Sequence, residues 1–257
     1  MNGAGSPNRP PALAPVAEVT LRIMLVAAAV CPCPPLLVPD VAAGAAPELD
    51  PARDACADAL GVLAAARPDQ LVVVGPGGRD ASYPEGARGS FRGFGVDLDV
   101  RLGRGAESAP ATLPASLAVA AWLLDRTGWA DAPVEGLGVA EALPVESCVR
   151  TGRDLAGRAG RVALLVMGDG SACRTLKAPG YLDARAAGFD AEIARALGAA
   201  DLAALRALDP GLARELRAGG RAPWQVLAGA AEDAGLGGSL LYDDAPYGVG
   251  YLVAAWS

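Results

Sequence analysis

Three apolar runs, each stopped by proline or glycine, constrain the fold of this chain more than any other feature. They cover 21–30 (LRIMLVAAAV), 71–74 (LVVV) and 161–167 (RVALLVM), and they lead into the turns CPCPP, GPGG and GDGSA. Proline lacks the N–H that a strand ladder requires, and such glycine-rich turns do not continue a regular element. Continuous apolar runs of this length predict strands that are buried on both faces of a sheet.

The segments between these runs have the period of helices. Apolar residues recur at spacings of three and four in 48–66 and 113–126, and 183–233 is largely helical, with Asp209 as a cap before Pro210. Strands that alternate with helices predict an α/β fold with a mostly parallel or mixed sheet and helices on both faces. The 257 residues, 52% of them hydrophobic, suffice for a single domain with one continuous core.

Further strands are predicted at 96–102, 134–139, 238–242 and 249–255. In the first of these, apolar and charged residues alternate, which is the period of a half-buried strand. The preceding segment, 79–95, is rich in Gly and Arg and lacks any period. It predicts a long surface loop of the kind that often covers a site.

Composition narrows the class of protein. Residues 1–22 are rich in Pro, Gly and Ala without the apolar segment of a secretory signal, so we expect a disordered leader before a domain over 23–257. The apolar stretch that follows is broken by prolines well short of the roughly 20 residues of a membrane helix. The net charge of −7 without a Lys/Arg run argues against nucleic acid, and five cysteines, an odd number, favour a reducing cytoplasm.

The turns after the apolar runs predict the position of a site. In sheets of this kind ligands bind beyond the carboxyl ends of the parallel strands. We therefore expect Cys33, Gly77 and Ala172 to line one cleft, with Asp169 and Ser171 beside them.

Three stretches at this rim resemble class III extradiol dioxygenase subunit-B-like proteins. The segment 31–39 (CPCPPLLVP) is similar to a first-strand motif in which His-Pro-Pro follows the strand. The segment 168–172 (GDGSA), with 178–183 after it, resembles the family's Gly-Asp-x-Ser-His loop, and 245–251 (APYGVGY) resembles its final strand. The resemblance extends over nearly everything from Met24 onward.

The resemblance implies a site where two His and one Glu hold Fe(II), with a further His as general acid and base. The chain contains no histidine. Cys33 and Gly77 stand at two ligand positions and Ala172 at the catalytic His, while the region of the Glu, around Gly219, offers only Glu215. Because Gly and Ala have no side-chain donor atom, iron-dependent ring cleavage does not carry over, and no cofactor is expected.

The candidate residues follow from these turns. Ligand binding is predicted for Cys33, Gly77, Asp169, Ser171, Ala172 and Tyr181. The candidates for catalysis are Asp169, Ser171, Lys177 and Tyr181. Asp169 and Ser171 either grip a polar ligand or bond only the backbone of their own turn. Cys31, Cys33 and Cys173 either form a thiolate site for Zn or Cu(I) or are small core residues.

The leading hypothesis is a degenerate dioxygenase-like protein that binds a small organic molecule or serves as a scaffold. With His replaced by Cys, Gly and Ala, its cleft should favour an uncharged or weakly anionic ligand over a cation. One alternative is an enzyme of different chemistry in the same cleft, built on a thiolate metal site or free of metal. The other is a partner subunit of a two-chain dioxygenase-like assembly, in which the site is completed by another chain of a homo- or hetero-oligomer. This alternative predicts an exposed apolar patch near 79–95.

Overall fold

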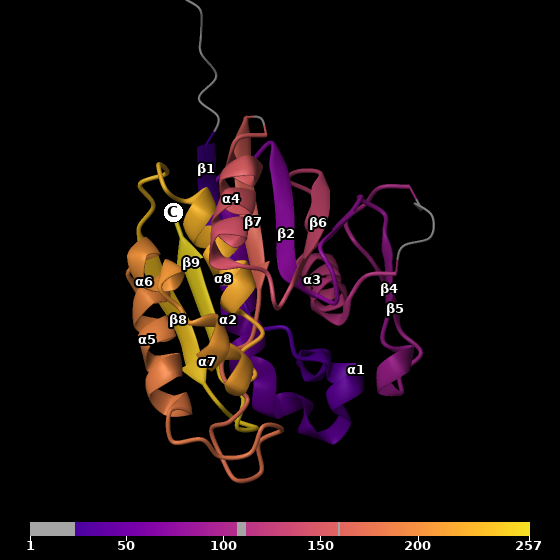
Figure 1. Cartoon of the computed structure of the whole chain (residues 1–257). Helices are drawn as coiled ribbons and strands as arrows, with labels where there is room; N and C mark the ends of the chain where they lie inside the picture. The colour runs from indigo at the N-terminus through magenta and orange to yellow at the C-terminus, as the bar shows by residue number, and fades with distance from the viewer. Residues whose placement is uncertain (1–23, 107–111, 159) are drawn as a thin grey trace, which may run out of the picture.

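A seven-stranded sheet runs through the parts of the chain that the computed structural model describes, residues 24–106, 112–158 and 160–257 (Figure 1). From edge to edge its strands are β3 (Ala81–Tyr83), β6 (Val134–Ala140), β2 (Gln70–Gly77), β7 (Arg161–Met167), β1 (Met24–Cys31), β9 (Tyr251–Trp256) and β8 (Gly238–Asp244). Strands β6, β2, β7 and β1 are parallel, and β3, β9 and β8 each run antiparallel to a neighbour. The sheet is therefore mixed, as the sequence predicts.

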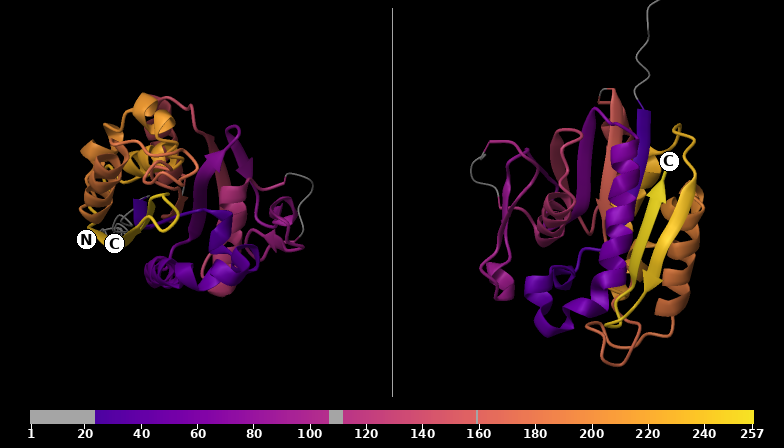
Figure 2. Two further views of the ribbon diagram at one scale, coloured as in Figure 1. Left: turned by 90° about the horizontal axis from the view of Figure 1, so that it is seen from below. Right: turned by 180° about the vertical axis from the view of Figure 1, so that it is seen from behind.

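Helices cover both faces of the sheet (Figures 1 and 2). One face carries α2 (Asp50–Ala65) and α3 (Ala115–Arg126). The other carries α4 (Val145–Ala156), α5 (Ala186–Gly198), α6 (Leu202–Arg206), α7 (Pro210–Glu215) and α8 (Arg221–Ala230). The short α1 (Pro39–Ala42) and 3-10 helices at Pro35–Leu37 and Ala43–Leu49 connect β1 to α2. The predicted α/β class is thus confirmed.

The central strands bury side chains on both faces. In β1, Ala27 and Ala29 belong to the core under α2 and α3, whereas Ala28 and Val30 belong to the opposite core. Because successive side chains point to opposite faces, a strand covered on both sides must be apolar throughout. This is why the central strands appear in the sequence as continuous apolar runs.

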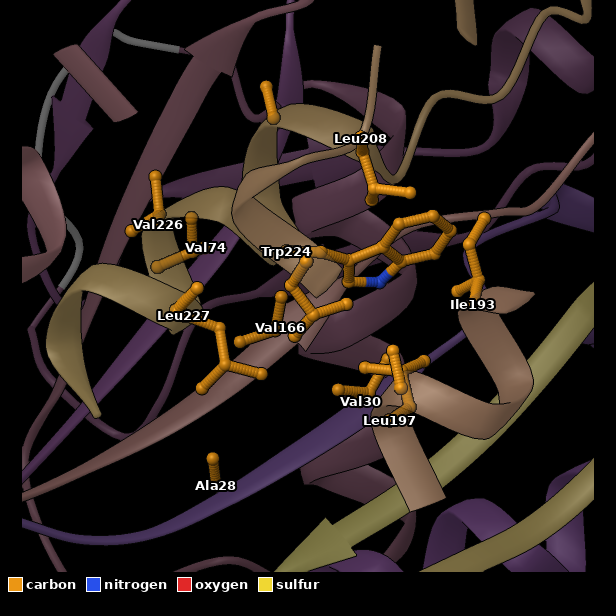
Figure 3. Close-up of a cluster of buried hydrophobic side chains, with 14 of the residues drawn as sticks. Ala28, Val30, Val74, Val166, Ile193, Leu197, Leu208, Trp224, Val226 and Leu227 are labelled. Atoms are coloured by element: carbon orange, nitrogen blue, oxygen red, sulfur yellow. The ribbon is translucent and has the colours of Figure 1, made fainter. Parts of the chain in front are cut away.

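Trp224 of α8 lies at the centre of the core on the opposite face of the sheet from α2 and α3 (Figure 3). Its indole is fully buried among Val30, Ile193, Leu197 and Leu208. Contacts of this size dominate the burial of apolar surface in a core. Trp224 therefore fixes the start of α8, three residues before it, against the sheet.

The segment 79–95 is not a plain surface loop. It contributes β3 to the edge of the sheet and β4 (Arg88–Ser90), which pairs with β5 (Asp99–Arg101). Tyr83 and Phe91 are buried in the core under α3. The aromatic rings thus anchor a segment that lacks any local period, which corrects the prediction from the sequence.

Two other segments, 96–102 and 1–22, are predicted as a strand and a leader. The predicted strand at 96–102 forms only over β5, and a short 3-10 helix (Arg92–Phe94) precedes it. The predicted leader, 1–22, lies outside the described residues. Among the described helices, none combines the length and the apolar character needed to cross a membrane.

Candidate functional site

The carboxyl ends of the four parallel strands open onto a cavity of about 770 Å³, which we call the rim cleft. The register keeps these ends level, since Cys31 pairs with Met167 and Gly77 pairs with Ala140. The residues that follow each strand therefore reach the same rim. The lining of the rim cleft includes Cys33, Gly77, Asp169 and Ala172.

Asp169 is held in place by the backbone of two other segments. The N–H of Cys33 donates to Oδ1 of Asp169 over 2.8 Å, and the N–H of Gly220 donates to the Asp169 carbonyl over 2.9 Å. Burial raises the pKa of the Asp169 carboxyl to about 7, and the bond from Cys33 offsets this only in part. A carboxyl with this pKa can both accept and donate a proton at neutral pH.

The Cys33 thiol beside it is a neutral group. Burial raises its pKa well above the ordinary value, and the nearby Asp169, Cys31 and Glu141 raise it further. The thiolate is the nucleophilic and metal-binding form of cysteine. At neutral pH Cys33 therefore lines the rim cleft as a protonated thiol.

The thiolate metal site considered for Cys31, Cys33 and Cys173 does not form. Cys31 is a free cysteine in the core under α2 and α3, where it accepts a hydrogen bond from the Cys56 thiol, while Cys173 lies in the opposite core. The Cys173 thiol donates to the Leu216 carbonyl over 3.5 Å. Within the described residues, no three His, Cys, Asp or Glu side chains are grouped so that they could hold a metal ion.

The donors at the rim do not fit Fe(II) either. Gly219 lines the rim cleft together with Cys33, Gly77 and Ala172, so the segments to which the resemblance assigns iron ligands do meet there. None of these residues carries an imidazole or a carboxylate. The acidic residues in the lining are Asp169 and Glu141, which cannot replace a facial set of two His and one Glu.

Ser171, Lys177 and Tyr181 do not belong to the cleft lining. Ser171 is fully buried: its Oγ accepts the N–H of Cys173 over 3.0 Å, and its own N–H donates to Asp190 over 2.7 Å. The Ser171 side chain therefore hydrogen-bonds the backbone of its own turn and does not face a ligand in the rim cleft. Lys177 and Tyr181 are exposed on the loop that follows, outside the cleft. Of the residues proposed for catalysis, Asp169 alone lines it.

The structure adds polar residues to the cleft that the sequence patterns do not indicate. Glu141 directly follows β6, Ser116 lies in the first turn of α3, and Arg217 follows α7. The Ser116 hydroxyl donates to the Pro76 carbonyl over 2.6 Å. Glu141 stands after a parallel strand just as Cys33 and Asp169 do, so the same argument from strand ends applies to it. Nothing local in the sequence marks Arg217.

The predicted apolar patch near 79–95 is not present. Phe94, 46% exposed, is the one exposed large hydrophobic side chain within that part of the described chain. A single exposed ring is ordinary for a protein surface. This segment therefore gives no support to the alternative of a partner subunit.

The fold and the cleft define an α/β protein with a cavity at the carboxyl ends of four parallel strands. No protein-family model and no curated protein sequence matches the chain. Among solved structures, it is similar to the crystal structure of the uncharacterized protein JW3007 from Escherichia coli K12, with a TM-score of 0.53 and 14% sequence identity. The match covers 90% of this chain and 99% of the other. At this identity the likeness shows a shared fold and nothing beyond it.

Proposed function

We propose that this chain is a degenerate class III extradiol dioxygenase subunit-B-like protein whose rim cleft binds a small organic molecule without iron-dependent ring cleavage. The observation that carries the proposal is the meeting of Cys33, Gly77, Ala172 and Gly219 in one cleft. These are the places where the resemblance expects iron ligands and a catalytic His. In this chain Gly77, Ala172 and Gly219 have no side-chain donor atom, and Cys33 supplies only a thiol.

The size and chemistry of the cleft support a small organic ligand. Sites for small molecules have volumes of about 300–1,000 Å³ and are mostly apolar, with a few polar groups that fix orientation. At about 770 Å³ the rim cleft lies in this range. Much of its wall is apolar, including Pro76, Pro114, Ala140, Ala142 and Val249. Asp169, Glu141 and Arg217 supply the polar groups.

One observation favours an alternative, a metal-free enzyme in the same cleft. A pKa of about 7 places the Asp169 carboxyl where general acid–base catalysis is most efficient. The Asp169→Asn variant separates the two functions. If the protein only binds its ligand, the variant retains binding, whereas an enzyme loses turnover.

Two measurements test the proposal. Protein loaded with Fe(II) and supplied with catechol or protocatechuate in air should give no yellow ring-fission product. Saturation-transfer NMR with a set of small aromatic and aliphatic molecules, catechol included, should detect binding. Ala115→Trp should abolish that binding, because Ala115 is exposed at the first position of α3 and lines the cleft.

The matched control is Ala187→Trp, an exposed position in the first turn of α5 that is absent from the cleft lining. It should bind the same molecules as the unsubstituted protein. A ring-fission product would overturn the degenerate interpretation. Absence of binding across the set, or equal binding by both tryptophan variants, would overturn the binding function.

A further inference from the structure

A second cavity, of about 680 Å³, opens beside the rim cleft. Arg214, Arg217 and Arg221 line it, and we call it the arginine chamber. The residues common to the walls of both cavities are Glu141, Ala142, Arg217 and Gly219. The two cavities are therefore adjacent, and Arg217 contributes to the walls of both.

Arg221 is a buried cation whose acceptors are uncharged. Its side chain is only 3% exposed. The guanidinium donates to the Leu143 carbonyl over 2.7 Å, to Oε1 of Gln225 over 3.0 Å and to the Glu141 carbonyl. No carboxylate pairs with it among the described residues. Because a buried charge without a counter-ion is costly, an anion in the chamber would stabilise this arrangement.

Arg214 and Arg217 are exposed at the mouth of the chamber. Within the described ranges neither forms an ion pair, and Arg217 donates through Nη1 to the Pro179 carbonyl over 2.9 Å. Elsewhere on the surface, Arg185 and Arg195 each hold two carboxylates. The chamber thus concentrates uncompensated positive charge in a chain whose net charge is −7.

The start of α8 adds to this positive potential. Gly219 precedes the ten-residue helix, Arg221 and Ala222 open it, and all three line the chamber. The N-terminal end of a helix carries a partial positive charge that favours anions. Glu141 is the one acidic residue in the described lining, against three arginines, and it lies on the wall shared with the rim cleft. The balance of charge around the chamber is therefore positive.

We infer that the arginine chamber holds the anionic group, a carboxylate or a phosphate monoester, of an organic ligand whose body occupies the rim cleft. The inference rests on the proposed function and specifies its ligand class as organic anions. Guanidinium groups bind planar oxyanions with two parallel hydrogen bonds, and such charge-assisted bonds are among the strongest in proteins. The rim cleft then supplies apolar contacts for the body of the ligand.

Isothermal titration with three probes tests this assignment: 3-phenylpropanoate, its methyl ester and phenyl phosphate. The acid should bind at least about tenfold more tightly than the ester, since charge-assisted hydrogen bonds contribute this much or more. The double variant Arg214→Gln/Arg217→Gln should reduce the affinity for the acid to that for the ester. Its charge-matched control is Arg126→Gln/Arg150→Gln, at exposed positions on α3 and α4 outside the chamber, which should leave the preference unchanged.

The outcomes separate the two proposals. Equal affinity for acid and ester would overturn the anion assignment, and so would an unchanged preference for the acid in the Arg214/Arg217 variant. The binding function would still stand if Ala115→Trp blocked binding of the probes. If none of the three probes binds the unsubstituted protein, the anion assignment fails, while the binding function still depends on the NMR set and the two tryptophan variants. Comparing the affinities for phenyl phosphate and 3-phenylpropanoate identifies which oxyanion the chamber prefers. Either preference supports the anion assignment.

Discussion

The backbone N–H of Cys33 donates a 2.8 Å hydrogen bond to Oδ1 of Asp169, although 136 positions separate the two residues in the sequence. The bond joins the turn after β1 to the turn after β7, two adjacent parallel strands. It stabilises the ionised carboxylate, while burial favours the protonated form. Burial has the larger effect, and the pKa of Asp169 rises to about 7.

This balance predicts a pH dependence of stability. The pKa of Asp169 is raised from 3.8 to about 7 by folding, so the folded chain binds the extra proton between these values. The free energy of unfolding should therefore decrease as pH rises through this window, by up to about 1.4 kcal/mol per pH unit. Asp169→Asn should lose this component, because its amide oxygen still accepts the Cys33 N–H but does not titrate.

Urea unfolding of both proteins from pH 4 to pH 8 measures the difference, and NMR titration of the Asp carboxyl carbons measures the pKa directly. Carboxylates whose pKa is lowered by arginines, such as Asp183 with a pKa of about 2, titrate below the window. They therefore do not mimic the effect. A difference between the two proteins that is constant with pH would contradict the prediction.

Asp190 of α5 holds the loop after β7 in place through two contacts. Its Oδ1 accepts the Ser171 N–H over 2.7 Å, and its Oδ2 pairs with Arg174 over 3.0 Å. The carboxylate is 1% exposed. Asp190→Ala should destabilise the protein by about 1–3 kcal/mol, because it leaves the buried Ser171 N–H without its acceptor. Asp190→Asn keeps the acceptor for Ser171 and should cost less; equal losses in urea unfolding would contradict this account.

The central strands could be predicted from the sequence because both of their faces are buried. That requirement leaves uninterrupted apolar runs such as 71–74 and 161–167, which local pattern alone detects. Helix α4 lies outside the elements predicted above, although Cys148, Val149 and Leu155 recur on one buried face at helical spacing. Its buried face includes Gly152, where an added Cβ would lie 2.0 Å from the Val226 carbonyl of α8. The close contact with α8 requires glycine at this position, so the spacing of apolar residues does not reveal which helix α4 packs against.

The candidate site could be predicted only in part, for a similar reason. Cys33, Asp169 and Ala172 follow strands, Gly77 is the last residue of β2, and the register of the sheet brings them together. Arg217 reaches the cleft through the packing of α7 and α8, and sequence spacing contains no information about that packing. Tyr181 is the opposite case, a residue predicted for the cleft that lies outside it. Its side chain is 63% exposed on the loop after β7.

Two buried tryptophans provide a matched measurement of one hydrogen bond. Nε1 of Trp256 donates to the Leu197 carbonyl over 2.7 Å, whereas Nε1 of Trp224 has no partner among the described residues. Both side chains are fully buried, so a change to Phe removes comparable volume at each. Trp256→Phe should cost about 1–3 kcal/mol more than Trp224→Phe, since it leaves the carbonyl of Leu197 short of its donor. Urea unfolding followed by circular dichroism gives both values, and the reverse order would refute the account.

The last prediction concerns the contact between the end of β7 and the start of α8. Gly168 follows β7 and Gly220 precedes α8, and a Cβ on Gly168 would lie 2.4 Å from the Gly220 Cα. The obstacle is backbone, which cannot rotate away as a side chain can. Gly168→Ala should therefore destabilise the protein by about 1–3 kcal/mol. It should also displace the start of α8 and weaken binding of the anionic probes.

Gly61→Ala is the control for this substitution. Gly61 is exposed inside α2, and nothing lies within 4 Å of an added Cβ there. In a helix interior this change should stabilise the protein by about 0.5–1 kcal/mol. Opposite signs for the two variants in urea unfolding are expected, because one glycine is required by contact and the other is not. A Gly168→Ala variant as stable as the unsubstituted chain would contradict this account. It would mean that α8 does not abut the end of β7.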